Sequence, residues 1–140
     1  KKHNVRIKDQ IQVAVINIQT VLRNSPVKMI YLLEVSQVQD FRCNAKEHAL
    51  AEDPKEACGV LVNDSYFPCN NIADQPDNDF VLDPKDYLKA RMKGKIQAVI
   101  HSHPKGGKAS QADHKACSQL RLPWHIYLIP QDQWLTINPS

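Results

Sequence analysis

Two histidines at the end of an apolar run are the clearest sign of chemistry in this 140-residue chain. His101 and His103 are separated by one residue and follow Val99 and Ile100. Because side chains alternate along a strand, both imidazoles would point to the same side and could reach one ion. Imidazole nitrogen suits zinc, and a catalytic zinc typically has three protein ligands and one open position. A third ligand is therefore needed, and Asp113 is the nearest candidate downstream.

Asp113 stands three residues after Ser110, in a spacing that begins many helices. An acidic side chain in the first turn of a helix is favoured by the helix dipole alone. With two histidines nearby, a carboxylate fixed at a helix start would also be a rigid third ligand. Together these residues predict a His2Asp site with one position open for water, which is typical of hydrolytic zinc. Ser102, between the histidines, should point away from them and hydrogen-bond the sheet or orient the loop.

A hydrolytic zinc site also needs a base that takes the proton from zinc-bound water and a donor that stabilises the oxyanion. Glu56 precedes a second apolar run, residues 57–62, and can be this base if the two strands pair or are neighbours. Without the histidine motif, a solvated carboxylate at a strand end would be the simpler interpretation. The Ser110 hydroxyl, or a backbone amide near it, can be the oxyanion donor.

The remaining histidines and cysteines are interpreted as structural. His48 falls on one face of an expected helix, and His125 falls on an expected strand. His114 and Cys117 fit the helix that follows the histidine motif, although either could complete a closed structural zinc site with four protein ligands. The four cysteines are scattered, so we expect reduced thiols in a cytosolic setting. A zinc knuckle or a disulfide pair is the alternative.

The elements that must position these residues alternate between helix and strand. One helix is expected from an N-cap at Ser36 to just before Pro54. The other expected elements are strands over residues 57–62, 66–69, 80–82, 96–100, 124–129 and 134–137, and helices over residues 84–93 and 110–121. This order predicts an α/β or α+β domain, a mixed β-sheet flanked by helices, over residues 36–140. Residues 1–35 are expected to form an appendage of uncertain structure.

Composition limits the partners of the chain. It has 18 Lys and Arg against 15 Asp and Glu, and these charges are interspersed except for a basic region from Lys89 to Lys95 and the Lys1-Lys2 pair. We therefore expect no nucleic-acid partner. No apolar run approaches the roughly 20 residues that span a membrane, and the first residues lack the pattern of a secretion signal.

The site residues resemble the signature of the JAMM (MPN+/JAB) metalloprotease family. That signature consists of Glu, His-Ser-His-Pro and Ser-x-x-Asp, which here correspond to Glu56 and to residues 101–104 and 110–113. The resemblance covers about residues 40 to 137. Three segments look particularly like the N-terminal domain of lambdoid phage tail-tip assembly proteins, namely residues 66–72, 83–84 and 122–124.

This resemblance implies a cytidine-deaminase-like JAMM/MPN fold and a zinc-dependent peptidase or isopeptidase. It implies Zn2+ ligands at His101, His103 and Asp113, a general base at Glu56 and an oxyanion-stabilising serine at Ser110. It also implies a protein or peptidoglycan peptide as substrate, other tail-tip proteins as partners, and a place in the host cytoplasm during assembly or in the virion tail. The phage relatives carry a cysteine-peptidase domain after this domain, and the present sequence ends before one could begin.

Two other functions compete with a hydrolase. A catalytically silent MPN-type scaffold in tail assembly would have the same fold, and a structural zinc domain would have a closed site. The complete set of Glu, His, His, Ser and Asp argues against the scaffold. The loop over residues 104–110 is shorter than in eukaryotic deubiquitinases, which disfavours a ubiquitin-binding groove of the eukaryotic kind. Selectivity is expected in the loops over residues 70–79 and around Gly106 and Gly107.

Overall fold

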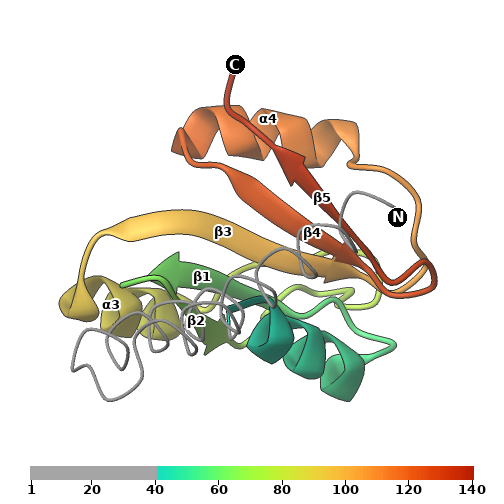
Figure 1. The fold of residues 1–140 in the computed structure, drawn as a ribbon, viewed down its shortest axis with the longest axis horizontal. Coiled ribbons are helices and arrows are strands. Elements are labelled where there is room, and N and C mark those ends of the chain that lie inside the picture. Colours follow the sequence, from blue (N-terminus) through green and yellow to red (C-terminus); the bar gives the residue numbers. More distant parts are fainter. Residues whose placement is uncertain (1–40) are drawn as a thin grey trace, which may run out of the picture. The chain divides into compact units, whose positions relative to one another are not determined.

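Strands and helices alternate along residues 41–140, which are the residues described by this computed structural model (Figure 1). The strands are β1 (Cys58–Val62), β2 (Ser65–Cys69), β3 (Ile96–His103), β4 (Trp124–Leu128) and β5 (Gln133–Ile137). The helices are one over residues 41–52, α3 (Pro84–Lys93) and α4 (Gln111–Leu120). The sheet order is β2-β1-β3-β4-β5, with β3 parallel to β4 and the other pairs antiparallel. The expected mixed sheet flanked by helices is confirmed, whereas the Ser36 cap and the appendage lie outside the described residues.

Local sequence accounts for the boundaries of these elements. The β1–β2 turn has Asn63 and Asp64 at φ 52° and 60°, the left-handed pair that a tight hairpin requires. Helix α3 begins where the Asp83 side chain accepts a hydrogen bond from the Lys85 amide at 2.9 Å, and Pro84 occupies the first turn. The two strands beside this turn and the helix from residue 84 agree with the ranges predicted from the sequence.

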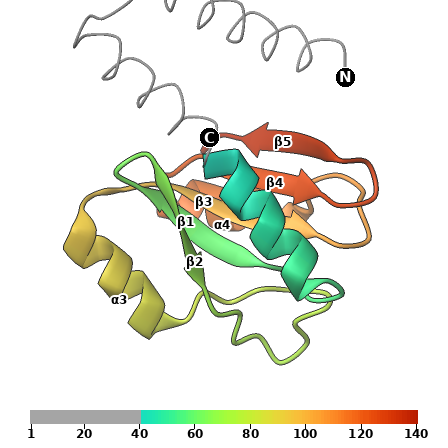
Figure 2. The same ribbon diagram turned by 60° about the horizontal axis from the view of Figure 1, so that its bottom comes forward.

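Helices cover both faces of the sheet. In Figure 2 the helix over residues 41–52 lies in front of the strands and α4 lies behind them. The front helix packs Ala49 against Ala57 and Tyr127. Behind the sheet, Cys117 of α4 packs against Val99 and Trp124. Side chains that alternate along β3 therefore belong to two different cores.

The pairing of β1 with β3 brings the two predicted halves of the site together. Cys58 lies opposite His101 and Val60 opposite Val99 in this antiparallel ladder. Glu56, two residues before Cys58, is thus close to the histidine end of β3. The expectation that the strand after Glu56 pairs with the strand that carries His101 is confirmed.

The expected strand over residues 80–82 does not form. Only an isolated bridge joins Asn71 to Leu82. Two backbone hydrogen bonds still join the segments, from the Ile72 amide to the Val81 carbonyl and from the Asp83 amide to the Asn70 carbonyl, each at 3.0 Å. The Asn71 side chain adds to them, because its Oδ1 accepts from the Val81 amide at 3.1 Å. An apolar triplet in the sequence does not reveal this mixed pairing.

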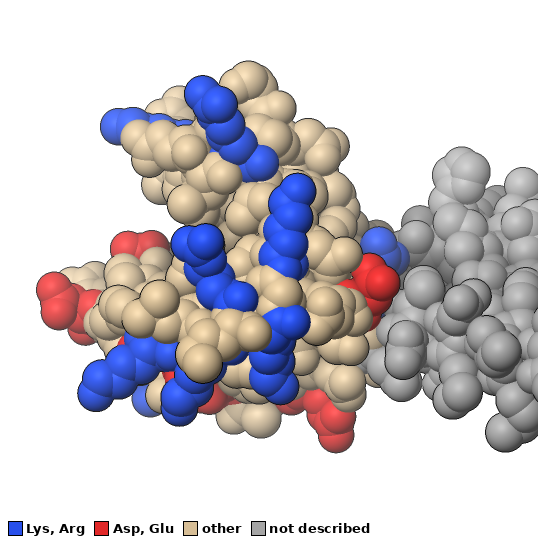
Figure 3. Space-filling model, turned by 90° about the vertical axis from the view of Figure 1, so that its left-hand side faces the viewer, with Lys and Arg blue, Asp and Glu red and all other residues tan. Residues whose placement is uncertain are grey.

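The basic region predicted from the sequence lies away from the histidines. It occupies the C-terminal half of α3 and the turn into β3, and Figure 3 shows several Lys and Arg side chains on this face. His101 and His103 lie at the opposite end of β3. Within residues 41–140, no helix is long and apolar enough to cross a membrane.

Replacing Gly59 with alanine should destabilise the fold. A Cβ atom at this position would lie 2.5 Å from the Phe67 carbonyl oxygen and 2.5 Å from Cε1 of Tyr66, so β1 and β2 would have to move apart. We expect a loss of about 1–3 kcal/mol in the free energy of unfolding, measured by urea denaturation. An unchanged denaturation midpoint would show that β2 can move away from the added methyl group without loss of stability.

Candidate metal centre

His101 and His103 lie at the C-terminal end of β3, and their side chains point to the face of the sheet that α4 covers. His101 is fully buried between the rings of Phe80, 4.3 Å away and stacked, and Trp124, 5.3 Å away and edge-on. His103 is half-buried. The two Nε2 atoms lie 3.2 Å apart. Strand alternation thus brings the two rings to one point, as their spacing predicts.

Asp113, in the first turn of α4, directs its carboxylate at the same point as the two imidazoles. Its Oδ1 lies 3.3 Å from Nε2 of His101, and its Oδ2 lies 3.2 Å from Nε2 of His103. Two ligand atoms on a tetrahedral zinc, each about 2.0–2.1 Å from the ion, are about 3.3–3.4 Å apart. The separations among the two imidazoles and the carboxylate therefore fit one shared zinc ion.

The same carboxylate also caps α4. The Ser110 amide donates a hydrogen bond to Oδ2 of Asp113 at 2.9 Å, and the Asp113 amide donates one to the Ser110 hydroxyl oxygen at 3.0 Å. This reciprocal pair is a capping box. The two interpretations that competed in the sequence are therefore compatible, because one oxygen faces His101 while the other serves both His103 and the cap.

Glu56 is buried and faces the two histidines. Its carboxylate oxygen and the imidazole nitrogens of His101 and His103 all lie within 4.8 Å of one another. Among the described residues, however, ion pairs to the histidines come from Asp113 and not from Glu56. Glu56 thus borders the cluster at a longer distance than Asp113, and with His101 and His103 it forms a group that could hold a metal ion.

The carboxylates of Glu56 and Asp113 differ in pKa because their surroundings differ. Burial raises the pKa of Glu56 to about 7, against the opposing charge of His103. Burial acts in the same direction on Asp113, but the hydrogen bonds from His101 and His103 outweigh it and hold the Asp113 pKa far below its usual range. Burial lowers the pKa of His101, although Asp113 opposes this shift. The surroundings thus favour the ionised form of Asp113, whereas the pKa of Glu56 lies near neutral pH.

Ser102 and Ser110 make different contacts. Ser102 is buried and points away from the histidines, and its Oγ accepts a hydrogen bond from the Ala57 amide at 2.8 Å. The predicted role of Ser102 as a bond to the sheet is thereby confirmed. Ser110 is exposed at the start of α4 and uses its oxygen to accept from Asp113, which leaves the hydroxyl hydrogen available to a substrate.

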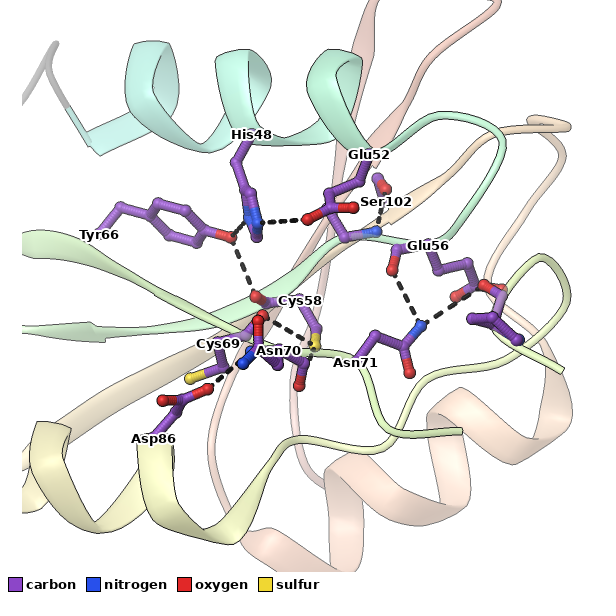
Figure 4. Close-up of polar contacts among 12 residues, drawn as sticks. His48, Glu52, Glu56, Cys58, Tyr66, Cys69, Asn70, Asn71, Asp86 and Ser102 are labelled. Atoms are coloured by element: carbon purple, nitrogen blue, oxygen red, sulfur yellow. Dashed lines mark hydrogen bonds and ion pairs between the residues drawn. The ribbon is translucent and has the colours of Figure 1, made fainter. Parts of the chain in front are cut away.

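Sequence reasoning missed the residues that hold Glu56. The Glu56 amide donates to the Pro76 carbonyl at 2.7 Å. The Glu56 carbonyl accepts from Nδ2 of Asn71 at 2.9 Å, as Figure 4 shows. Asn71 also donates to the Asp79 carbonyl at 2.9 Å. The loop after β2 was expected to be a polar surface loop, and an asparagine there gives no sign that it binds a backbone group beside a catalytic candidate.

The other titratable candidates lie outside the cluster. His114 is exposed on α4, and Cys117 is buried with its thiol 3.2 Å from the Leu122 carbonyl. His125 lies 3.0 Å from the Thr136 hydroxyl. Each of these residues has the structural place expected from the sequence. The four cysteines are free thiols, as expected.

Comparison with known proteins places the chain in a family. Residues 42–136 match the family described as prokaryotic homologs of the JAB domain. The chain is 32% identical to desampylase from Haloferax volcanii over 98 residues, which cover 61% of this chain and 69% of that protein. A solution structure of protein DSY2949 from Desulfitobacterium hafniense shares the fold with a TM-score of 0.54 at 24% identity, covering 70% of this chain and 77% of that one.

Two phage proteins are also similar. Tail tip assembly protein K of Escherichia phage N15 is 41% identical over 97 residues, which are 66% of this chain and 40% of that protein. Tail tip assembly protein K of Escherichia phage lambda is 46% identical over 46 residues, which are 32% of this chain and 23% of that protein. The chain thus spans less than half the length of these two relatives.

The matched region begins in the helix over residues 41–52, ends in β5, and contains Glu56, both histidines and Asp113. The chain therefore belongs to the family of prokaryotic homologs of the JAB domain.

Proposed function

We propose that this domain is a zinc-dependent hydrolase that cleaves a peptide or isopeptide bond. The convergence of His101, His103 and Asp113 on one point, with separations of 3.2–3.3 Å, carries the proposal. Three protein ligands leave one position open, as in catalytic rather than structural zinc sites. When bound, zinc would supply the Lewis acidity that hydrolysis of an unactivated amide requires at neutral pH.

Glu56 is proposed as the general base. Its carboxylate faces the histidines, and its pKa of about 7 allows it both to accept and to release a proton near neutral pH. Glu56 would take a proton from the attacking water and pass it to the leaving amine. The backbone bonds to Pro76 and Asn71 would keep the carboxylate in place between these two transfers.

Ser110 is proposed to stabilise the oxyanion. Its hydroxyl lies at the N-terminus of α4, where free amide groups favour a developing negative charge. Because its oxygen is already fixed by the Asp113 amide, the hydroxyl can donate without a large reorientation. Ser110 would therefore hold the substrate carbonyl while Glu56 moves the proton.

The similarity to tail tip assembly proteins and to a desampylase narrows the biological setting. We propose that the substrate is a tail protein or a peptidoglycan peptide, and that the domain acts in the host cytoplasm during assembly or in the virion tail. The zinc form should be incubated with tail-tip proteins, with purified peptidoglycan and with an isopeptide-linked protein conjugate, and the products analysed by mass spectrometry. A newly formed amino group in the products of any of these substrates supports a hydrolase. Intact substrates, together with stable binding of a tail protein, would favour the catalytically silent scaffold.

We expect the purified protein to bind about one zinc and to lose it when Asp113 is changed. Asp113→Ala should lower zinc affinity by more than the roughly 10- to 100-fold typical of losing an outer-shell partner. Ser110→Ala is the matched control, because it removes about 1 kcal/mol of capping while leaving the ligands intact. Zinc affinity is measured by competition with a chelator. Equal zinc affinities for both variants would mean that Asp113 is only a cap.

Replacing Glu56 with glutamine should abolish turnover while the metal remains bound. Glutamine keeps the shape of the side chain but cannot accept the proton, so kcat should fall by about 10²- to 10⁴-fold. Glu47→Gln, an exposed change on the helix over residues 41–52, is the control for loss of one negative charge. Loss of zinc from Glu56→Gln would instead identify Glu56 as a ligand.

A further inference from the structure

A hydrogen-bonded chain of side chains connects the helix over residues 41–52 to the start of β1. Nδ1 of His48 lies 2.6 Å from the Tyr66 hydroxyl, and this hydroxyl lies 3.1 Å from the carbonyl oxygen of Cys58. Figure 4 shows His48 extending from the helix toward Tyr66, whose hydroxyl points to the backbone of β1. Both side chains are partly shielded from water. Neither residue belongs to the metal centre.

The Tyr66 hydroxyl has two partners in this chain. It donates its proton to the Cys58 carbonyl, and in that arrangement it accepts from Nδ1 of His48. The other ring nitrogen of His48, Nε2, lies 3.5 Å from a carboxylate oxygen of Glu52 on the same helix, so the ring is held from both sides. His48 thus orients the tyrosine hydroxyl toward β1.

The sequence makes room for this contact at Gly59. The ring of Tyr66 lies against the backbone of Gly59, where a Cβ atom would be 2.5 Å from Cε1 of the ring. Tyr66 can therefore reach across β1 from the neighbouring strand β2. A glycine, an aromatic hydroxyl and a histidine from three elements together form the contact to the Cys58 carbonyl.

The contacted carbonyl is two residues from Glu56. Between them, Ala57 donates its amide hydrogen to Oγ of Ser102 at 2.8 Å and accepts from the Ser102 amide at 2.9 Å. The backbone is thus fixed at Glu56 by the loop, at Ala57 by β3, and at Cys58 by Tyr66. Loss of the Tyr66 contact would remove one of these restraints, while Cys58 stays paired with His101 in β3 and with Cys69 in β2.

We propose that Tyr66, oriented by His48, is a positioning residue for Glu56. By holding the Cys58 carbonyl, it fixes the start of β1 and keeps the Glu56 carboxylate directed at His101 and His103. This inference rests on the proposed function, because a position of Glu56 has catalytic meaning only in a hydrolase. It assigns a role to two side chains that touch neither the metal ligands nor the open position.

Four variants test the proposal. Tyr66→Phe keeps the ring over Gly59 and removes only the hydroxyl. Tyr127→Phe is the matched control, because it removes a buried hydroxyl that donates to Asp132 at 2.6 Å while keeping the ring that packs against Ala57. His48→Leu removes the donor to Tyr66, whereas His48→Asn keeps an N–H donor near the place of Nδ1.

In steady-state assays of the zinc-loaded protein, Tyr66→Phe and His48→Leu should lower kcat on the order of tenfold with KM unchanged, because a small misplacement of a catalytic group slows the chemical step. His48→Asn should restore most of the activity, and Tyr127→Phe should match the wild type. Zinc content should remain the same in all four. Equal effects of Tyr66→Phe and Tyr127→Phe, or no rescue by His48→Asn, would overturn the proposal.

Amide hydrogen exchange provides a readout that needs no substrate. In Tyr66→Phe the Ala57 amide should exchange faster than in the wild type, while Tyr127→Phe should leave its rate unchanged. Wild-type protein that cleaves none of the tested substrates would contradict the proposed function, and the exchange rates alone would then decide whether Tyr66 holds the start of β1. Unchanged exchange at Ala57 in Tyr66→Phe would show that it does not.

Discussion

The antiparallel pairing of β1 with β3 is the constraint on which the candidate site depends. It sets Cys58 opposite His101, and so brings Glu56 to the end of β3 across 45 residues of sequence. A shift by one residue would turn every side chain of β1 to the other face, and would remove Glu56 from the histidines. The double hydrogen bond between Ala57 and Ser102 lies at this point of the ladder and opposes such a shift.

Asp113 shows how one side chain can couple local structure to the site. Its carboxylate closes the capping box of α4 and faces both histidines, so the geometry that begins the helix also orients the proposed third ligand. A strongly lowered pKa follows from the same contacts, since burial by itself would have raised it. A carboxylate that stays ionised and is held by the helix is well suited to a metal.

Much of the fold and the site was predictable because the signals are local. Alternation along β3 indicated the shared direction of His101 and His103, and the serine spacing indicated the start of α4. The helix over residues 41–52 was expected to carry His48 on one face, but the partner of His48 comes from a hairpin 18 residues away. The same holds for Asn71, whose side chain accepts from the Val81 amide and donates to the Glu56 carbonyl. Contacts between side chains and distant backbone groups have no periodicity, so the sequence alone does not predict them.

The surroundings of Glu56 explain why a buried carboxylate is tolerated at this place. Burial of an ionised carboxylate is costly, and the raised pKa reflects that cost. The Glu56 amide donates to the Pro76 carbonyl and the Glu56 carbonyl accepts from Asn71, so the backbone is held without neutralising the side chain. A direct ion pair would instead have lowered the pKa of the carboxylate and favoured its charged form. Glu56 is thus held through its backbone, whereas Asp113 is held through its carboxylate, and this difference separates the two acidic residues.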